Sequence, residues 1–188
     1  TVAQLERGGG KHPFEPIALA GPNCALPHGE PGERRLAVGE PLLLDFGTTA
    51  RGYASDITRT FSVGKPSPRL VEVYEVVQAA NEAGRAAAGP GVPAQDVDRA
   101  TRRVIEDAGF GPYFTHRTGH GLGMEAHEGP NIVEGNAQVL EPGMVFTVEP
   151  GIYLPGEVGV RIEDNLLVTA DGAESLTTFP RNLRIIGV

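Results

Sequence analysis

The sequence predicts an α+β fold in which helices pack on one side of an antiparallel sheet. Strand-like apolar segments fill the first third of the chain, two amphipathic helical segments follow, and the remainder is again rich in strands. Strands and helices that are grouped in this way, rather than alternating one by one, are typical of α+β folds. The length of 188 residues fits one domain that can bury an ordinary hydrophobic core.

Apolar runs bounded by turn residues mark the strands before the helices. We expect these strands over residues 14–20, 41–48 and 52–63, with a loop at 21–24 after the first. The second and third form a hairpin, and a two-residue tip at Ala50 and Arg51 would place Asp45 directly opposite Asp56. Since alternate strand residues point to one face, Asp56 shares a polar face with Thr58, Thr60 and Ser62.

Two helices follow, indicated by apolar residues spaced three and four apart. The first begins at Pro68 after the N-cap Ser67 and stops before Gly89, and the second covers 94–108 and ends at Gly109. The faces that we expect to be buried are Leu70, Val73, Val77, Ala80, Gly84 and Ala87 in the first helix, and Val97, Thr101, Val104 and Ala108 in the second. Three further strands are predicted over 144–153, 160–169 and 183–188.

Composition excludes several classes of function. The net charge of −8 leaves no positive excess for non-specific binding to nucleic acid. No apolar run approaches the ~18 residues of a membrane span, and no basic-then-apolar leader opens the chain. The single cysteine, Cys24, can form neither an internal disulfide nor a thiolate metal site, and we interpret it as a small packing residue. This cysteine usage fits a reducing, cytoplasmic setting.

Four acidic residues lie inside or at the end of apolar strands. Asp45 and Asp56 form one opposed pair, and a hairpin centred on the turn at Gly156 places Glu149 and Glu163 face to face as a second. Carboxylates this close repel one another unless a cation lies between them. One such pair is compatible with solvated residues on an exposed hairpin. Two independent pairs predict divalent metal, as two ions that share carboxylate oxygens.

Histidines supply a further type of ligand. His116, His120 and His127 fall within twelve residues, and glycines surround His120. Because glycine lets the backbone approach an ion closely, we predict His120 as a metal ligand. A phosphate-binding glycine loop is the weaker alternative, since no strand–turn–helix unit surrounds the segment. His12 is interpreted as an ordinary packing or surface residue.

The segments LLLDFG, GYASDITRTF, HRTGHGLGMEAHEGP, TVEPGIY and GVRIEDN occur in this order. Together they strongly resemble the pita-bread metallopeptidases, in the branch of Xaa-Pro aminopeptidases and Xaa-Pro dipeptidases, from about Phe14 to the C-terminus. The resemblance implies a curved antiparallel sheet with helices on its outer face and two pseudo-symmetric halves. It also implies an N-terminal helix and an N-terminal domain ahead of this chain. We therefore expect residues 1–188 to be a catalytic domain, part of something longer, that lacks both.

The resemblance further implies roles for individual residues. The positions that match the metal ligands are Asp45, Asp56, His120, Glu149 and Glu163. Glu149 would also accept the proton of the attacking water, while His127 would steady the oxyanion and His28 the leaving nitrogen. The pocket for a prolyl residue would be framed by His28, His116, His127, Tyr153 and Arg161.

The implied reaction is hydrolysis of the peptide bond before proline, in dipeptides or at peptide N-termini. The expected cofactors are two divalent ions, with Mn²⁺ or Co²⁺ favoured by the oxygen-rich ligands and Zn²⁺ as an option. The expected partner is a peptide with proline in second position. A homodimer is a further option, and neither nucleic acid nor membrane is expected as a partner.

Three alternatives stay open. A methionine aminopeptidase would share the five ligands, although that resemblance lacks an arginine at the position of Arg161, two residues before the last glutamate. A creatinase-like amidinohydrolase would share the fold but not the metal ligands, all of which are kept here. The third alternative is a catalytically silent peptidase-fold module that binds peptides or other proteins. Metal content of the purified chain would separate such a module from an enzyme.

Overall fold

The computed structural model describes residues 2–187 and confirms the α+β class. Its helices are α1 (Val2–Glu6), α2 (Pro68–Ala87) and α3 (Ala94–Asp107), with short 3-10 turns η1 (Gly21–Ala25) and η2 (Gly111–Tyr113). Its strands are β1 (Ile17–Ala20), β2 (Pro41–Phe46), β3 (Thr49–Ala50), β4 (Tyr53–Ala54), β5 (Ile57–Val63), β6 (Gly119–Gly121), β7 (Glu128–Ile132), β8 (Val145–Val148), β9 (Gly151–Leu154), β10 (Val158–Arg161), β11 (Asp164–Val168), β12 (Ala173–Ser175) and β13 (Arg184–Ile186).

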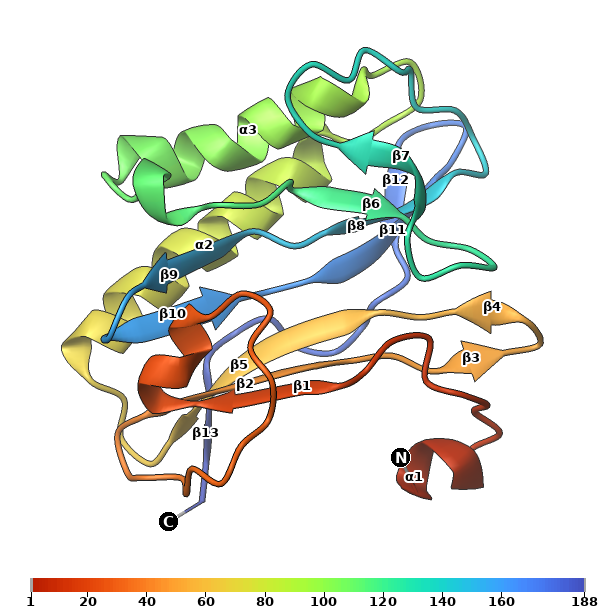
Figure 1. Cartoon of the computed structure of the whole chain (residues 1–188). Helices are drawn as coiled ribbons and strands as arrows, with labels where there is room; N and C mark the ends of the chain where they lie inside the picture. The colour runs from red at the N-terminus through yellow and green to blue at the C-terminus, as the bar shows by residue number, and fades with distance from the viewer. Residues whose placement is uncertain (1, 188) are drawn as a thin grey trace.

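The strands form two main sheets that face the same pocket. One has the order β1-β2-β5-β13, and the other has the order β12-β11-β8-β6-β7. The two-stranded ribbons β9–β10 and β3–β4 extend them. Helices α2 and α3 lie side by side along one face of the strands (Figure 1). The pairing is antiparallel throughout except between β13 and β5, which run parallel.

Helix α2 begins as predicted. The Ser67 hydroxyl accepts from the Leu70 amide at 3.1 Å, and Pro68 occupies the first turn, where its missing N–H costs nothing. Its buried face packs on the β9–β10 ribbon in a core that also includes Phe110 and Phe114, the residues on either side of η2. The members of this core are Leu70, Val73, Tyr74, Val77, Ala80, Ile105, Phe110, Phe114, Ile152, Leu154, Val158, Val160 and Ile162.

The predicted face of the second helix is partly wrong. Val97 and Thr101 are buried, but the next buried residue is Ile105, whereas Val104 is only half-buried and Ala108 is exposed. The buried residues of α3 follow one another at a spacing of four, because this spacing keeps one side of the helix against α2 and the sheet. In the first helix, Ala87 is likewise only half-buried.

The first hairpin is formed, but its register differs from the prediction. Asp45 pairs with Thr58, and Ala50 pairs with Tyr53, so the tip is Arg51-Gly52. Both tip residues have positive φ, 52° and 88°, as a type I′ turn requires. Asp56 is therefore not directly opposite Asp45. Because the slip is two residues, the two side chains still share a face.

The second hairpin has the predicted register. Val158 pairs with Leu154 and Arg161 with Gly151 around the turn at Gly156, whose φ is 77°. The same register continues from Asp164 opposite Val148. This hairpin is nevertheless broken in the middle into β9–β10 and β8–β11, where Pro150 has no amide hydrogen for the ladder.

The remaining strand boundaries differ by a few residues. The strand expected over 14–20 begins at Ile17, the segment 21–24 is a 3-10 turn, and the strand over 52–63 is interrupted before Ile57. The last strand is Arg184–Ile186, and Val188 lies outside the described residues. Within residues 2–187, no helix combines the length and the apolar character needed to cross a membrane.

Candidate metal centre

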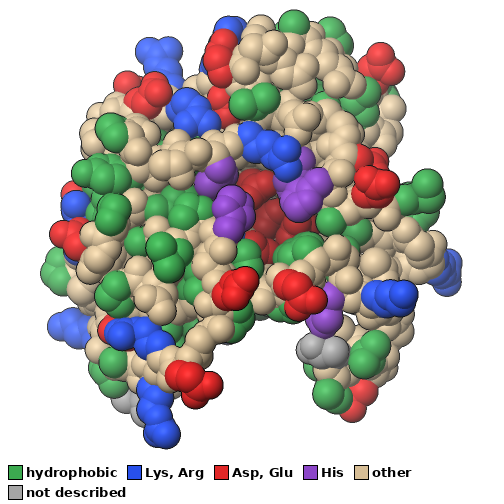
Figure 2. Space-filling model, in the orientation of Figure 1, with side chains coloured by type: hydrophobic (Ala, Val, Ile, Leu, Met, Phe, Trp, Pro, Cys, Tyr) green, Lys and Arg blue, Asp and Glu red, His purple; other side chains and the backbone are tan. Residues whose placement is uncertain are grey.

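A polar pocket opens between the two sheets. Figure 2 shows it as a hollow with acidic side chains at its floor and histidines at its rim. Its lining draws on both halves of the chain and consists of Phe14, Glu15, Ile17, His28, Asp45, Asp56, His116, Arg117, His120, His127, Glu149, Arg161 and Glu163. All five predicted metal ligands are among these residues, so the fold brings them to one place.

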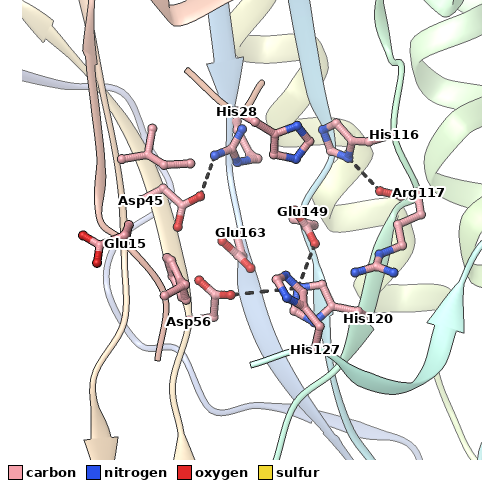
Figure 3. Close-up of a pocket in the computed structure, with 13 residues that line it drawn as sticks. Glu15, His28, Asp45, Asp56, His116, Arg117, His120, His127, Glu149 and Glu163 are labelled. Atoms are coloured by element: carbon pink, nitrogen blue, oxygen red, sulfur yellow. Dashed lines mark hydrogen bonds and ion pairs between the residues drawn. The ribbon is translucent and has the colours of Figure 1, made fainter. Parts of the chain in front are cut away.

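Three of the four acids lie where a strand ladder is interrupted. Asp56 precedes β5, Glu149 follows β8, and Glu163 separates β10 from β11. Asp45 alone lies within a strand, β2. At a break the backbone is free to turn a side chain inward without opposing a neighbour in the ladder. Figure 3 shows Asp45 and Asp56 on one wall of the pocket and Glu149 with His120 on the other.

His120 presents an unprotonated nitrogen to these acids. Its Nδ1 lies 3.0 Å from the carbonyl oxygen of Gly121, and since a carbonyl only accepts, Nδ1 carries the proton. Nε2 then faces Glu149 Oε1 at 3.3 Å and Asp56 Oδ2 at 3.9 Å. Burial lowers the pKa of His120 to about 4, so the ring is neutral at pH 7. A neutral ring held by a backbone carbonyl is the usual state of a histidine ligand.

The carboxylates are buried close together, and the neighbouring protein groups do not offset the cost of ionising all of them. Burial, followed by the charges of Asp45 and Glu149, raises the pKa of Asp56 to about 9. Desolvation raises the pKa of Glu149 to about 7 and that of Glu163 well above its ordinary range.

A divalent ion would relieve this crowding. One possible ligand atom from each of Asp56, His120 and Glu163 lies within 4.8 Å of the others. In addition, Asp45 Oδ1 and Asp56 Oδ1 are buried without a hydrogen-bond partner among the described residues. Buried polar atoms normally have partners, so these oxygens fit ligands of a cation.

A hydrogen-bonded chain borders the acids on the side of the β9–β10 ribbon. Arg161 Nη1 donates to the Tyr153 hydroxyl at 2.8 Å, and this hydroxyl lies 2.8 Å from His116 Nε2. His116 Nδ1 in turn lies 2.8 Å from the carbonyl oxygen of Arg117, so Nε2 is the acceptor of the tyrosine proton. Burial lowers the pKa of His116 to about 4, which fits this neutral tautomer.

The structure places the other predicted site residues in two positions. His28 and His127 line the pocket and are exposed at its mouth, whereas His116 and Arg161 are deeper. Tyr153 is buried behind His116 and Arg161 and is not a lining residue. His12 and Cys24 also lie outside the lining, as expected.

Sequence reasoning missed four lining residues: Phe14, Glu15, Ile17 and Arg117. Phe14 and Glu15 lie just ahead of β1, Ile17 is its first residue, and none of the three carries a motif. Arg117 directly follows His116 in the HRTGHG segment, and this position could have predicted that it lines the pocket.

Antiparallel sheets backed by two helices bring carboxylates and a neutral histidine together in one pocket, an arrangement typical of a divalent-metal centre. The chain belongs to metallopeptidase family M24, whose profile matches residues 2–170. Solved structures also match with a pita-bread fold, as the sequence predicts. The prolidase from Thermococcus sibiricus has a TM-score of 0.95 and 45% identity over 97% of this chain. The X-Pro aminopeptidase from Thermotoga maritima has a TM-score of 0.96 and 39% identity over 98%.

Curated relatives agree with the structural matches. An Xaa-Pro dipeptidase of Lactobacillus delbrueckii subsp. lactis is 45% identical over 185 residues, which are 98% of this chain and 50% of that protein. The chain likewise covers 50% of the Thermococcus prolidase and 53% of the Thermotoga aminopeptidase. It therefore spans about half the length of the relatives that it matches.

Proposed function

We propose that residues 1–188 form the catalytic part of an exopeptidase that hydrolyses the peptide bond before proline. The observation that carries this proposal is the convergence of four acids and His120 in one pocket, where two buried carboxylate oxygens have no hydrogen-bond partner within residues 2–187. The names of the relatives support proline specificity, because they include both Xaa-Pro dipeptidases and X-Pro aminopeptidases. These names leave both dipeptides and longer peptides as substrates.

We infer that two divalent ions would be held by the side chains of Asp45, Asp56, His120, Glu149 and Glu163. When bound, such ions lower the pKa of water and polarise a carbonyl group. Oxygen-rich ligation favours Mn²⁺ or Co²⁺, with Zn²⁺ as an alternative.

The protein's own groups would then move protons and orient the substrate. Glu149 would accept the proton of the attacking water and pass it to the leaving nitrogen. His127 and His28, which line the pocket, would donate to the oxyanion and to the leaving group, respectively. His116 would line the side that receives proline, oriented by Tyr153 and Arg161.

Proline specificity follows from hydrogen bonding. A bond before proline is a tertiary amide without an N–H, so the site need not supply an acceptor there. A secondary amide would leave its N–H unpaired, at a cost of about 1–3 kcal/mol. The partner that we propose is thus a peptide with proline in second position. A homodimer remains an option, and a cytoplasmic location is part of the proposal.

The test is kcat/KM for Ala-Pro and Ala-Pro-Pro against Ala-Ala and Met-Ala, with the metal content of the same preparation. We expect about two ions per chain and a preference of roughly tenfold to a hundredfold for the proline substrates. A preference for Met-Ala would indicate a methionine aminopeptidase instead. A protein that binds no ion in excess Mn²⁺ would be a silent binding module.

A further inference from the structure

The hydroxyl group of Thr58 connects two walls of the pocket. Thr58 lies on β5, is fully buried, and donates from Oγ1 to Glu163 Oε2 at 2.6 Å. Arg161 Nε donates to the same Oγ1 at 3.2 Å. Arg161 Nη2 also donates to Asp45 Oδ2 at 2.5 Å. A continuous chain of hydrogen bonds therefore runs from Glu163 through Thr58 and Arg161 to Asp45.

Only one assignment of donors and acceptors fits this chain of hydrogen bonds. A guanidinium group has donors and no acceptor, so the contact between Arg161 and Thr58 uses a lone pair of the hydroxyl. The hydroxyl has a single hydrogen, and that hydrogen is left for Glu163. Glu163 Oε2 is thus held as an acceptor. The other carboxylate oxygen, Oε1, is left to face a ligand in the pocket.

Glu163 depends on this one contact. Its side chain is buried at 2% exposure, and Thr58 is the only donor to its carboxylate within residues 2–187. An acid with a single donor can rotate about its terminal torsion unless that donor is fixed. Thr58 is fixed, because its own carbonyl oxygen accepts from the Glu163 amide at 3.1 Å and the side chain is pinned by Arg161.

We propose that Thr58 is a positioning residue that orients the Glu163 carboxylate for a divalent ion. This inference rests on the metal centre of the proposed function. Groups that hold a metal ligand by hydrogen bonds typically contribute 10- to 100-fold to metal affinity. No other side chain on β5 contacts a pocket carboxylate in this way.

The test is the affinity of the protein for Mn²⁺, measured by titration calorimetry without substrate. Thr58→Val removes the hydroxyl and keeps the branched shape, and should weaken the binding of at least one ion by 10- to 100-fold. Thr58→Ser keeps the hydroxyl and should bind within about threefold of the parent.

Thr60→Val is a matched control. Thr60 lies on the same strand face, is also buried, and its hydroxyl both donates to the Arg161 carbonyl and accepts from the Arg161 amide, each at 3.1 Å. Its loss removes hydrogen bonds to the same neighbour but none to a pocket carboxylate. Thr60→Val should therefore keep the Mn²⁺ affinity of the parent, even if it unfolds at lower temperature.

Equal affinity of the parent and Thr58→Val would overturn the inference while leaving the proposed function intact. Equal weakening in the valine and serine variants would overturn it as well, because the hydroxyl would then not be the group responsible. A parent that binds no Mn²⁺ would overturn both proposals. Should Thr58→Val not fold, Thr58→Ala removes the same hydroxyl without an added methyl group and provides the same comparison.

Discussion

Arg161 and Asp45 form a buried ion pair between the two halves of the chain, with Nη2 and Oδ2 2.5 Å apart across 116 residues of sequence. Burial lowers the pKa of Arg161, but Tyr153, Asp45 and Glu149 together outweigh it and raise that pKa above its ordinary value. The guanidinium is thus a permanent charge in the wall of an acidic pocket. It joins β10 of one half to β2 of the other.

Replacing Arg161 should destabilise the metal-free protein. Arg161→Gln leaves the buried Asp45 without its cation and Tyr153 without its donor, and the loss of one partner of a buried pair costs about 3–5 kcal/mol. Urea unfolding in the presence of a chelator measures this loss in the free energy of unfolding. Arg99→Gln is the control, because the Arg99–Glu134 pair is exposed and solvent screens it. Equal effects of the two variants would contradict a structural role for the buried pair.

The Asp56 carboxylate should add to stability only when metal is present. Since its pKa is raised to about 9 in the metal-free protein, folding at pH 7 forces the carboxyl to take up a proton, which costs stability. Asp56→Asn removes this cost, so without metal the variant should melt at a higher temperature than the parent. Bound ions stabilise the parent by about 2.7 kcal/mol at a hundredfold excess over Kd, and the variant should lose most of that gain together with turnover. Thermal unfolding with and without Mn²⁺ gives both quantities. An unchanged shift with Mn²⁺ would remove Asp56 from the ligand set.

His116 should make stability fall on acidification. Its pKa is about 4 when folded and near 6.5 when unfolded, so between these values the unfolded chain binds more protons. The stabilisation is therefore present above pH 6.5 and is lost as the pH falls toward 4. The shift corresponds to on the order of 3 kcal/mol. Unfolding of metal-free parent and His116→Asn across this range should show a steeper loss in the parent, and parallel curves would disprove the assignment.

His127 should affect rate rather than metal content. Its ring packs edge-on against His120 at 4.3 Å between centroids but is exposed at the pocket mouth. His127→Ala should keep its ions and lose about 10²–10³ in kcat, the usual effect of removing one group that stabilises an oxyanion. His12→Ala is the comparison, since His12 does not line the pocket. A His127 variant that sheds its ions would instead place that residue in the metal ligand set.

The sequence alone determined the fold class, the second hairpin and the five candidate ligands that meet in the pocket. These depend on local signals: a capped helix start at Ser67, a turn at Gly156 that sets the register, and acids that interrupt apolar strands. Each signal lies within a few residues of the feature that it predicts. Local rules were therefore sufficient.

Only the tertiary structure decided the rest. The first hairpin turns at Arg51-Gly52 rather than one residue earlier, and this placed Thr58, not Asp56, opposite Asp45. No local pattern shows that Thr58 donates to Glu163, because the two residues are 105 positions apart and meet only when the halves close. The same holds for the parallel pairing of β13 with β5. Contacts between distant segments depend on how packed layers come together, and spacing along the chain does not encode that geometry.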